Sequence, residues 1–257
     1  MTAGPLAGRG ILITRPAHQA GNLAMLIRAA GGNPIIFPAL EILDPADPQP
    51  LFDAIDRLDT YDLAIFISPN AVTRVMSRMA ARRAWPAGLR VAAIGKGGVS
   101  ELERHGIRGV IVPQCGFDSE RLLEMPQLQA VSGQRVLILR GDGGRELLGD
   151  TLAARGAQVD YVACYRRARP QADPAPLLQA WAQDGVHAVI VTSSEGLRNL
   201  FVMLGKPGES LLQHTPLLVP HPRIAAVARE LGCREVIGTA PGDDGLLAGL
   251  LQQFAAK

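Results

Sequence analysis

The sequence predicts an α/β protein with two similar domains, each a parallel sheet covered by helices in a three-layer arrangement. Three observations lead to this prediction. Short apolar runs rich in β-branched residues alternate with longer amphipathic stretches, and the second half of the chain repeats the pattern of the first. The 257 residues are 47% hydrophobic and 19% charged, which is enough apolar material for two packed cores and excludes a disordered or coiled-coil chain.

The internal repeat has a constant offset of 125 residues. Ile11–Arg15 aligns with Val136–Arg140, and Asp62–Ser68 aligns with His187–Ser193. A single offset with almost no gaps over nearly the whole chain predicts an internal duplication.

Five strands are expected in each half. The runs lack polar alternation, which is typical of parallel strands that helices cover on both faces. The expected ranges are 11–15, 34–37, 63–67, 91–94 and 110–112 in the first half, and 136–140, 159–163, 188–192, 216–219 and 235–237 in the second.

Helices are expected between these strands. The clearest is Ala20–Ala30, which carries its leucines and isoleucine on one face and is followed by Gly31 and Gly32 as a stop signal. Ala71–Arg82 and Glu195–Leu204 follow their strands in the same way. Strands alternating with helices predict parallel pairing.

Two proline-rich segments interrupt the pattern at equivalent places in the repeat. They are Leu43–Pro50 and Arg167–Pro176, and both are expected to be connectors, since proline disfavours helix interiors and central strands. Each follows an extended segment, Phe37–Ile42 in one half and Tyr161–Arg166 in the other. Whether these extended segments stay in one domain or cross between domains is left open by the residues alone.

Charge and cysteine content exclude several classes of function. A net charge of +2 and an aromatic content of 4% do not indicate binding to nucleic acid or to a membrane. The three cysteines, Cys115, Cys164 and Cys233, match no disulfide framework and no metal spacing. Met1–Gly10 lacks the apolar core of a signal peptide and no run is long enough to span a membrane, so a cytoplasmic protein is expected.

Small, hydroxyl-bearing and cationic residues follow the strands. Ligands of open parallel sheets bind at the carboxyl ends of the strands, where helix N-termini offer N–H groups, so this chemistry favours a polycarboxylate ligand. The alternative for each residue is a helix cap or a tight turn, which requires the same residue types. The segments are Thr14–Pro16, Ser68–Asn70, Gly95–Gly98, Arg140–Gly144, Thr192–Ser194 and Pro220–Arg223.

Motifs for common cofactors and nucleophiles are missing from the sequence. It contains no P-loop, no dinucleotide-binding glycine pattern and no nucleophile elbow, so no cofactor and no metal are expected. Four histidines are not spaced as metal ligands or as a catalytic relay, and they are interpreted as surface or turn residues: His18, His105, His187 and His214.

Several short motifs, in order and over essentially the full chain, resemble those of the uroporphyrinogen-III synthase family. The motifs are Ile13–Pro16, Phe37–Ile42, Phe66–Val72, the segment around Tyr165, Val191–Ser194 and Asp243–Leu247. The resemblance implies two flavodoxin-like domains joined by a two-stranded β-ladder, with the active site in the cleft between the domains. One domain would contain 1–37 and 169–257, the other 43–162, and the ladder 38–42 and 163–168.

The resemblance also implies a reaction in tetrapyrrole biosynthesis. The enzyme would cyclise hydroxymethylbilane, a linear polycarboxylate tetrapyrrole, to uroporphyrinogen III with loss of water and inversion of ring D. Unassisted closure gives the type I isomer without inversion, so catalysis is chiefly conformational control with acid assistance. A monomer without cofactor, acting on a small molecule, is expected.

Candidate site residues follow from the resemblance and from charge. Tyr165 matches the family tyrosine proposed to assist departure of the hydroxyl, and its alternative role is to pack on the ladder. Substrate carboxylates would be bound by Ser68 and Ser193, with Asn70, Thr192 and Ser194 beside them, and strand-end charge adds Lys96, Arg140 and Arg223. Each of these three cations could instead pair with a surface carboxylate.

The sequence departs from the family at two turns. Gly98 stands where the family often has threonine, and Pro220–Arg223 lacks the usual Ser or Thr, so main-chain N–H groups are expected to replace hydroxyl donors there. The alternative from another class is a non-catalytic two-domain protein that binds an anionic small molecule, which the fold alone does not exclude.

Overall fold

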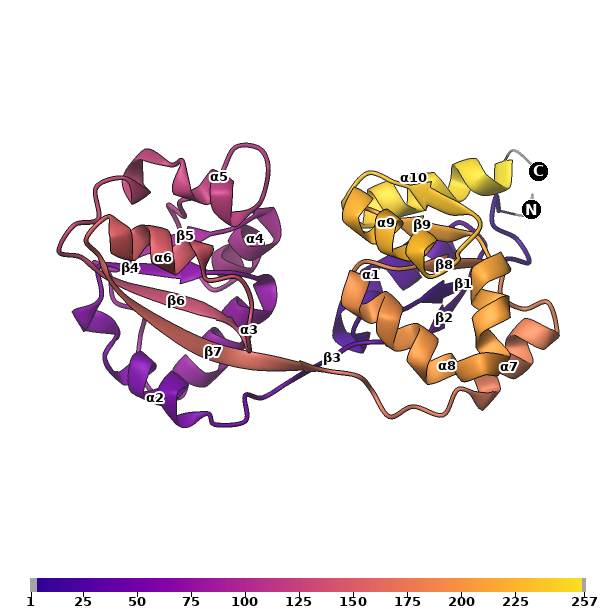
Figure 1. Ribbon diagram of the computed structural model, residues 1–257, viewed down its shortest axis with the longest axis horizontal. Helices are drawn as coiled ribbons and strands as arrows, with labels where there is room; N and C mark the ends of the chain where they lie inside the picture. The colour runs from indigo at the N-terminus through magenta and orange to yellow at the C-terminus, as the bar shows by residue number, and fades with distance from the viewer. Residues whose placement is uncertain (1–3, 256–257) are drawn as a thin grey trace. The chain divides into compact units, whose positions relative to one another are not determined.

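The computed structural model describes residues 4–255, which form two compact units (Figure 1). Unit 1 contains the chain up to Glu41 and from Ala168 onwards, and unit 2 contains Ile42–Arg167. The chain therefore leaves unit 1 after its first two strands and returns to it at Ala168. The predicted two-stranded ladder between the domains stays a prediction.

The sheet of unit 1 has five strands: β1 (Gly10–Ile13), β2 (Asn33–Ile36), β8 (Ala188–Ile190), β9 (Leu217–Val219) and β10 (Val236–Gly238). Their order is β10-β9-β8-β1-β2, and every neighbouring pair is parallel. The central strands β1, β8 and β9 are buried along their whole length, which is why they read as uninterrupted apolar runs.

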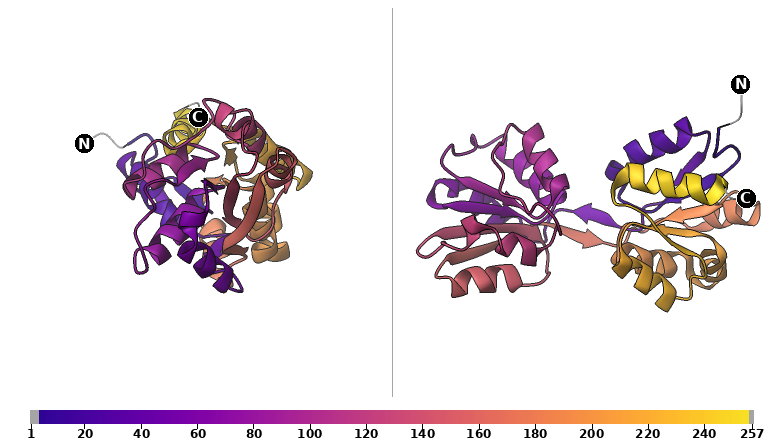
Figure 2. Two further views of the ribbon diagram at one scale, coloured as in Figure 1. Left: turned by 90° about the vertical axis from the view of Figure 1, so that its left-hand side faces the viewer. Right: turned by 90° about the horizontal axis from the view of Figure 1, so that it is seen from above.

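Helices cover both faces of this sheet: α1 (Ala17–Ala29), α7 (Ala175–Ala182), α8 (Ser194–His214), α9 (Pro222–Glu230) and α10 (Gly242–Ala255). One core joins Leu12 and Val189 to α7, α8 and α9. The other joins Ile11 and Ile13 to α1 and α10, which lie together on the opposite side of the sheet (Figure 2, indigo and yellow helices). Alternate residues of β1 thus enter different cores.

The second sheet contains β3 (Glu41–Leu43), β4 (Leu63–Phe66), β5 (Arg90–Ala93), β6 (Arg135–Gly141) and β7 (Gln158–Ala168) in the order β3-β7-β6-β4-β5. The pairs β4–β5, β4–β6 and β6–β7 are parallel. The register between β6 and β7 shifts at Arg140 and Gly141, so that Gly141 pairs with Tyr165.

The helices of unit 2 are α2 (Gln49–Asp56), α3 (Pro69–Met79), α4 (Lys96–Arg104), α5 (Ser119–Leu123) and α6 (Leu147–Ala154). Leu122 and Leu123 of α5 pack with Leu148 and Leu152 of α6 on one face of the sheet. The amphipathic helix α3 buries Val72, Val75 and Met76, and lies beside α2 and α4.

The predicted α/β fold with parallel sheets is confirmed, and nine of the ten expected strands form. The exception is 110–112, where only Ile111 makes a single bridge, to Ala92. Strand β7 is longer than expected because the extended segment Tyr161–Arg166 continues the strand 159–163 without a break.

Strands 125 residues apart take the same place in the two sheets. In the first sheet β1 lies between β2 and β8. In the second sheet β6 lies in the same way between β7 and β4. The repeat in the sequence is therefore matched by a repeat in strand order, although the duplication itself stays an inference.

The proline-rich connectors are shorter than expected. Helix α2 begins at Gln49 and α7 at Ala175, so Pro50 and Pro176 lie in first turns rather than in loops. The first turn tolerates proline because its N–H groups have no intrahelical partner. The segment α8 runs on to His214, but Gly205, with a φ of 59° and a ψ of −167°, is not helical, so the first part of α8 ends at Leu204 as expected.

Candidate functional site

The hydroxyls of Ser68 and Ser193 occupy equivalent positions at the carboxyl ends of β4 and β8. Ser68 Oγ accepts a hydrogen bond from Ala71 N–H (3.2 Å) at the start of α3. Ser193 Oγ accepts one from Gly196 N–H (2.8 Å) at the start of α8. Both serines therefore cap helices as hydrogen-bond acceptors, so each hydroxyl keeps its own hydrogen for a further partner. Both residues are half-buried.

Tyr165 lies within β7, opposite Gly141 at the end of β6, and reaches Ser68. Its phenol oxygen is 2.9 Å from Ser68 Oγ, although the two residues are 97 positions apart. The side chain is only 1% exposed, and its ring packs against Gly141, where a Cβ would come within 2.8 Å of the ring. Glycine at 141 is therefore required for the position of this ring.

Arg167 adds a positive charge beside the phenol. Arg167 Nη2 lies 3.5 Å from the Tyr165 oxygen, and its guanidinium carbon is 5.8 Å from the ring centroid. Because an arginine only donates hydrogen bonds, the Tyr165 oxygen is the acceptor of this long contact.

A cavity of about 230 Å³ lies next to Ser68. It is formed between the starts of α3 and α4, and its lining consists of Phe66, Ile67, Ser68, Pro69, Ile94, Gly95, Gly97 and Gly98. No side chain caps α4. The N–H groups of Lys96 and Gly97 precede the first turn's backbone hydrogen bond, which Gly98 N–H donates to Gly95 O (3.0 Å). Such a helix start is suited to an anionic group.

Gly98 lines this cavity, whereas Lys96, in the same helix start, does not. Gly98 is buried, and a Cβ there would come 3.2 Å from the Cβ of Ala93, so the backbone is tightly packed. Lys96 is exposed, and its Nζ lies 5.7 Å from the ring centroid of Phe117. Asn70 lies in the first turn of α3 and is half-buried.

Arg140 and Arg223 do not line the cavity beside α4. The guanidinium of Arg140 lies 4.0 Å from the ring centroid of Tyr161 and 3.6 Å from Glu146 Oε1, so it already has a carboxylate partner. Arg223 is exposed in the first turn of α9. Its N–H donates to Nδ1 of His221 (3.0 Å), which caps this helix in place of the usual hydroxyl.

The corresponding edge of unit 1 holds Thr192, Ser193 and Ser194, all half-buried. Among the side chains of residues 4–255, Ser194 Oγ is one of two buried polar atoms without a hydrogen-bond partner. Thr192 and Ser194 flank the helix-capping Ser193 directly, as their sequence positions require.

An ion pair at the end of β1 was not selected from the sequence. Arg15 Nη1 donates to Asp243 Oδ1 (2.6 Å), and Asn22 Nδ2 donates to Asp243 Oδ2 (2.7 Å). Arg15 belongs to the strand-end segment Thr14–Pro16 and is the equivalent of Arg140 in the repeat, but the sequence does not predict its carboxylate partner. Asp243 comes from α10, 228 residues away, and no local pattern indicates that contact.

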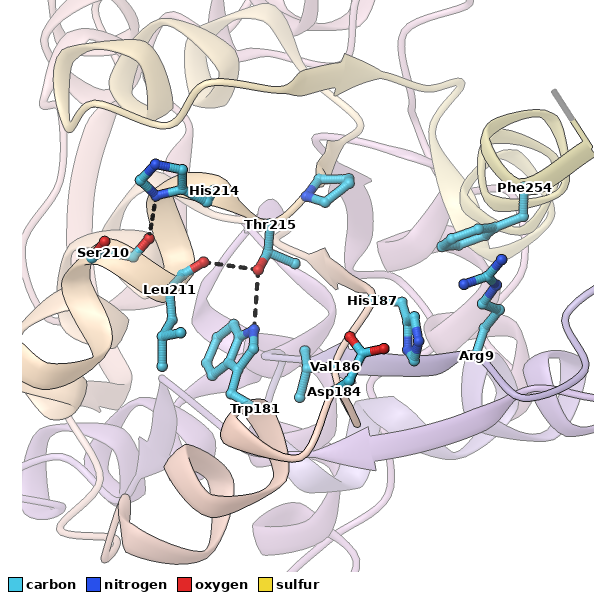
Figure 3. A pocket seen from close by; sticks show the side chains of 11 residues that line it. Arg9, Trp181, Asp184, Val186, His187, Ser210, Leu211, His214, Thr215 and Phe254 are labelled. Carbon is cyan, nitrogen blue, oxygen red and sulfur yellow. Dashed lines mark hydrogen bonds between the residues drawn. The ribbon is translucent and has the colours of Figure 1, made fainter. Parts of the chain in front are cut away.

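A hollow beside His187 lies at the opposite edge of the unit 1 sheet. The pocket, of about 500 Å³, includes Arg9, His187 and Pro216, which directly precede β1, β8 and β9 (Figure 3). His187 Nδ1 accepts a hydrogen bond from Gly10 N–H (3.0 Å). In the other half of the repeat, Asp62 Oδ2 accepts from Arg135 N–H (2.8 Å) in the equivalent place, so this histidine has a structural role.

Replacing His187 with leucine is expected to destabilise unit 1 by about 1–3 kcal/mol, because Gly10 N–H loses its acceptor. His187→Asn retains an acceptor oxygen like that of Asp62 and is expected to restore more than half of the loss. Urea denaturation of the two variants measures the difference. Equal stability of His187→Leu and the natural chain would show that water replaces the acceptor.

The thiols are not suited to nucleophilic catalysis. Burial raises the pKa of Cys164 to about 12 and the pKa of Cys233 to about 11, whereas Cys115 is exposed. Within residues 4–255, no group of three His, Cys, Asp or Glu side chains could hold a metal ion, and no helix is long and apolar enough to cross a membrane.

Alkylation is expected to modify Cys115 alone in the folded protein at pH 8, and all three cysteines in denaturant. The two buried thiols also predict a loss of stability in alkali. They stay protonated in the folded state, while in the unfolded state they ionise near pH 9, so stability is complete below pH 9 and falls as the pH rises towards 11 and 12. Mass spectrometry after iodoacetamide treatment counts the modified thiols. Rapid modification of Cys164 in the native protein would contradict its burial.

Comparisons with known proteins agree over nearly the whole chain. A family model described as uroporphyrinogen-III synthase HemD matches residues 21–248. The chain is 37% identical over 245 residues to the uroporphyrinogen-III synthase of Escherichia coli, covering 93% of this chain and 99% of that relative. It is 36% identical over 203 residues to the synthase of Synechococcus elongatus, covering 77% and 76%.

Solved structures show the same fold. Mutant uroporphyrinogen III synthase from Thermus thermophilus aligns with a TM-score of 0.62 at 18% identity, covering 97% of this chain and 100% of that chain. Uroporphyrinogen-III synthetase from Helicobacter pylori aligns with a TM-score of 0.58 at 14% identity, covering 95% and 99%.

Proposed function

Because the chain belongs to the uroporphyrinogen-III synthase family, we propose that it cyclises hydroxymethylbilane to uroporphyrinogen III, with loss of water and inversion of ring D. The observation that carries this proposal is 37% identity to a curated synthase along 99% of the relative's length. The reaction is a step of tetrapyrrole biosynthesis. It requires no metal or organic cofactor, because the substrate itself supplies the leaving group and the nucleophilic carbon.

The carboxyl edge of the unit 2 sheet supplies donors for substrate carboxylates. The start of α4, bordered by Gly97 and Gly98, lets a carboxylate approach the backbone N–H groups closely, and exposed Lys96 adds a positive charge. Asn70 adds a half-buried amide at the start of α3. These groups favour a carboxylate at this cavity.

The carboxyl edge of the unit 1 sheet supplies a second set of donors. We assign Thr192, Ser193 and Ser194 to substrate carboxylates, since the three residues lie half-buried at a helix start and the buried Ser194 Oγ has no hydrogen-bond partner. Arg223 is exposed beside the start of α9 and provides charge. Arg140 is already stacked and paired, so it contributes charge rather than a free donor.

Tyr165 is assigned to the departure of the hydroxyl group. The phenol can donate a hydrogen bond, and Arg167 beside it places a positive charge near its oxygen. Loss of the hydroxyl produces an azafulvene, which the substituted α-carbon of ring D then attacks. The protein must fold the chain for that attack, since unassisted closure gives the type I isomer.

We also propose that the protein acts as a monomer. Among residues 4–255 the exposed large apolar side chains come from separate elements, so they do not suggest a continuous interface: Met25, Ile36, Phe117, Leu147 and Val202. Light scattering at micromolar concentration measures the mass, and a dimer mass would overturn this proposal.

The test of function is direct. The purified protein is added to freshly made hydroxymethylbilane without cofactor, the product is oxidised, and type I and type III uroporphyrin are separated by chromatography. A dominant type III product is expected. Type I alone, at the rate of the protein-free control, would overturn the enzyme proposal and favour a protein that only binds an anionic small molecule.

A further inference from the structure

Ser68 and Tyr165, whose hydroxyls are hydrogen-bonded to each other, differ in how far a substrate can reach them. Tyr165 is 1% exposed and does not line the cavity beside α4, whereas Ser68 is half-buried and lines it. A general acid must lie within hydrogen-bond distance of the group that it protonates. A substrate hydroxyl in this cavity therefore meets Ser68 first.

The neighbours of the two hydroxyls favour one direction for the hydrogen bond between them. The Tyr165 oxygen accepts from Arg167, and Ser68 Oγ accepts from Ala71 N–H. When the phenol hydrogen is donated to Ser68 Oγ across 2.9 Å, the hydrogen of Ser68 remains for a group in the cavity.

We propose that the Ser68 hydroxyl, rather than the phenol of Tyr165, touches the departing hydroxyl of the substrate, and that Tyr165 is a positioning residue that supplies its proton through Ser68. This inference rests on the proposed function. It gives Ser68 a role in the reaction that differs from binding a carboxylate.

The step balances as follows in protons and electrons. The lone pair of the pyrrole nitrogen forms the exocyclic double bond of a cationic azafulvene, and the C–O bond breaks with its electron pair moving to the oxygen. That oxygen takes the proton of Ser68 and leaves as water. Ser68 takes the proton of Tyr165, whose phenolate faces the Arg167 guanidinium. The proton released when the ring closes returns to the phenolate.

The other half of the repeat lacks this pair. Ser193 is the equivalent of Ser68 and caps its helix in the same way, but the residue 125 positions before Tyr165 is Leu40. A phenol therefore contacts Ser68, whereas the sequence offers none at the equivalent place behind Ser193. Ser193 serves as the matched comparison for the loss of a helix cap.

Steady-state formation of the type III isomer tests the relay in four variants: Ser68→Ala, Tyr165→Phe, the double variant and Ser68→Thr. Each single variant is expected to lower kcat by about 10²-fold with KM changed less than about twofold. The double variant is expected to fall no more than about twofold further, because both changes interrupt one relay. Ser68→Thr keeps a hydroxyl and a cap, and is expected to retain at least about a third of kcat.

Two controls separate catalysis from folding. Ser68→Ala and Ser193→Ala each lose a helix cap and are expected to lower Tm by about 2–4 °C. Ser193→Ala is expected to raise KM at nearly natural kcat, unlike Ser68→Ala.

Either of two results would overturn the relay. The first is a natural kcat in Ser68→Ala with a reduced kcat in Tyr165→Phe, which would mean that the phenol acts directly. The second is a double variant whose loss is the product of the single losses. Both are read against a natural chain that makes type III product, so they are distinct from failure of the proposed function, in which the natural chain makes only type I.

Discussion

Tyr165→Phe is expected to lower kcat for type III uroporphyrinogen by about 10²-fold, because the phenol proton is lost while the ring stays in place. KM is expected to change little, since the side chain is 1% exposed and does not line the cavity. Type I product should rise in proportion, as unreacted hydroxymethylbilane closes in solution. Chromatography of the oxidised products measures both isomers.

The expected stability of this variant separates a role in the reaction from a role in packing. Tyr165→Phe keeps the ring against Gly141 and loses the hydrogen bond to Ser68 together with the long contact from Arg167, at a cost of about 0.5–1.5 kcal/mol. Collapse of Tm would show that the residue is structural. An unchanged kcat would show that the phenol takes no part in the reaction.

Tyr61 provides the matched control in the same unit. It is buried, its phenol donates to Asp160 Oδ2 (2.6 Å), and burial together with this carboxylate raises its pKa to about 12. Tyr61→Phe also removes one hydrogen bond, but the residue precedes β4 and lies at the opposite end of that strand from Ser68. It is expected to lose similar stability and to keep its kcat.

Gly10→Ala is expected to have the largest effect on stability, about 3 kcal/mol or more. A Cβ at position 10 would lie 1.7 Å from the carbonyl oxygen of Gly185. Because this contact is to backbone, neither Gly10 nor Gly185 can move away without breaking the start of β1. The backbone conformation of Gly10 does not require glycine, since its φ is not positive. Glycine is required because the chain segments of Gly10 and Gly185 approach each other closely.

Two tryptophans allow each unit to be followed separately. Trp181 lies in unit 1 and Trp85 in unit 2, so single-tryptophan variants report the two transitions in urea. Gly10→Ala is expected to shift the Trp181 transition and not that of Trp85. Gly21→Ala is the control in unit 1, because nothing lies within 4 Å of its added Cβ in the middle of α1. It is expected to stabilise by about 0.5–1 kcal/mol, and a similar gain in Gly10→Ala would contradict the packing argument.

Local sequence patterns were sufficient for the fold class and for most strands. Runs such as Leu63–Phe66 and Val136–Leu139 are apolar on both faces because helices cover both sides of a parallel sheet, and that burial leaves a signal within each run. The repeat by itself also relates Ser68 to Ser193, since equivalent strands end in equivalent helix starts. The two-domain boundaries and the ladder stay predictions.

Some differences from the sequence-based expectations have local reasons. The range 110–112 makes only a single bridge, at the edge of the sheet. Pro50 and Pro176 were placed in connectors, but a first helical turn accepts proline as readily as a loop does.

The sequence by itself determined that hydroxyl, glycine and cationic residues would collect where parallel strands end, because strand direction is encoded in short apolar runs joined by helices. Only the tertiary structure decided which of them meet. Tyr165 reaches Ser68 through a register shift between β6 and β7, Arg15 pairs with Asp243 across 228 residues, and Arg140 is already occupied by Glu146. Contacts of this kind depend on strand order and register, to which residues distant in the chain contribute jointly, so no local pattern contains them.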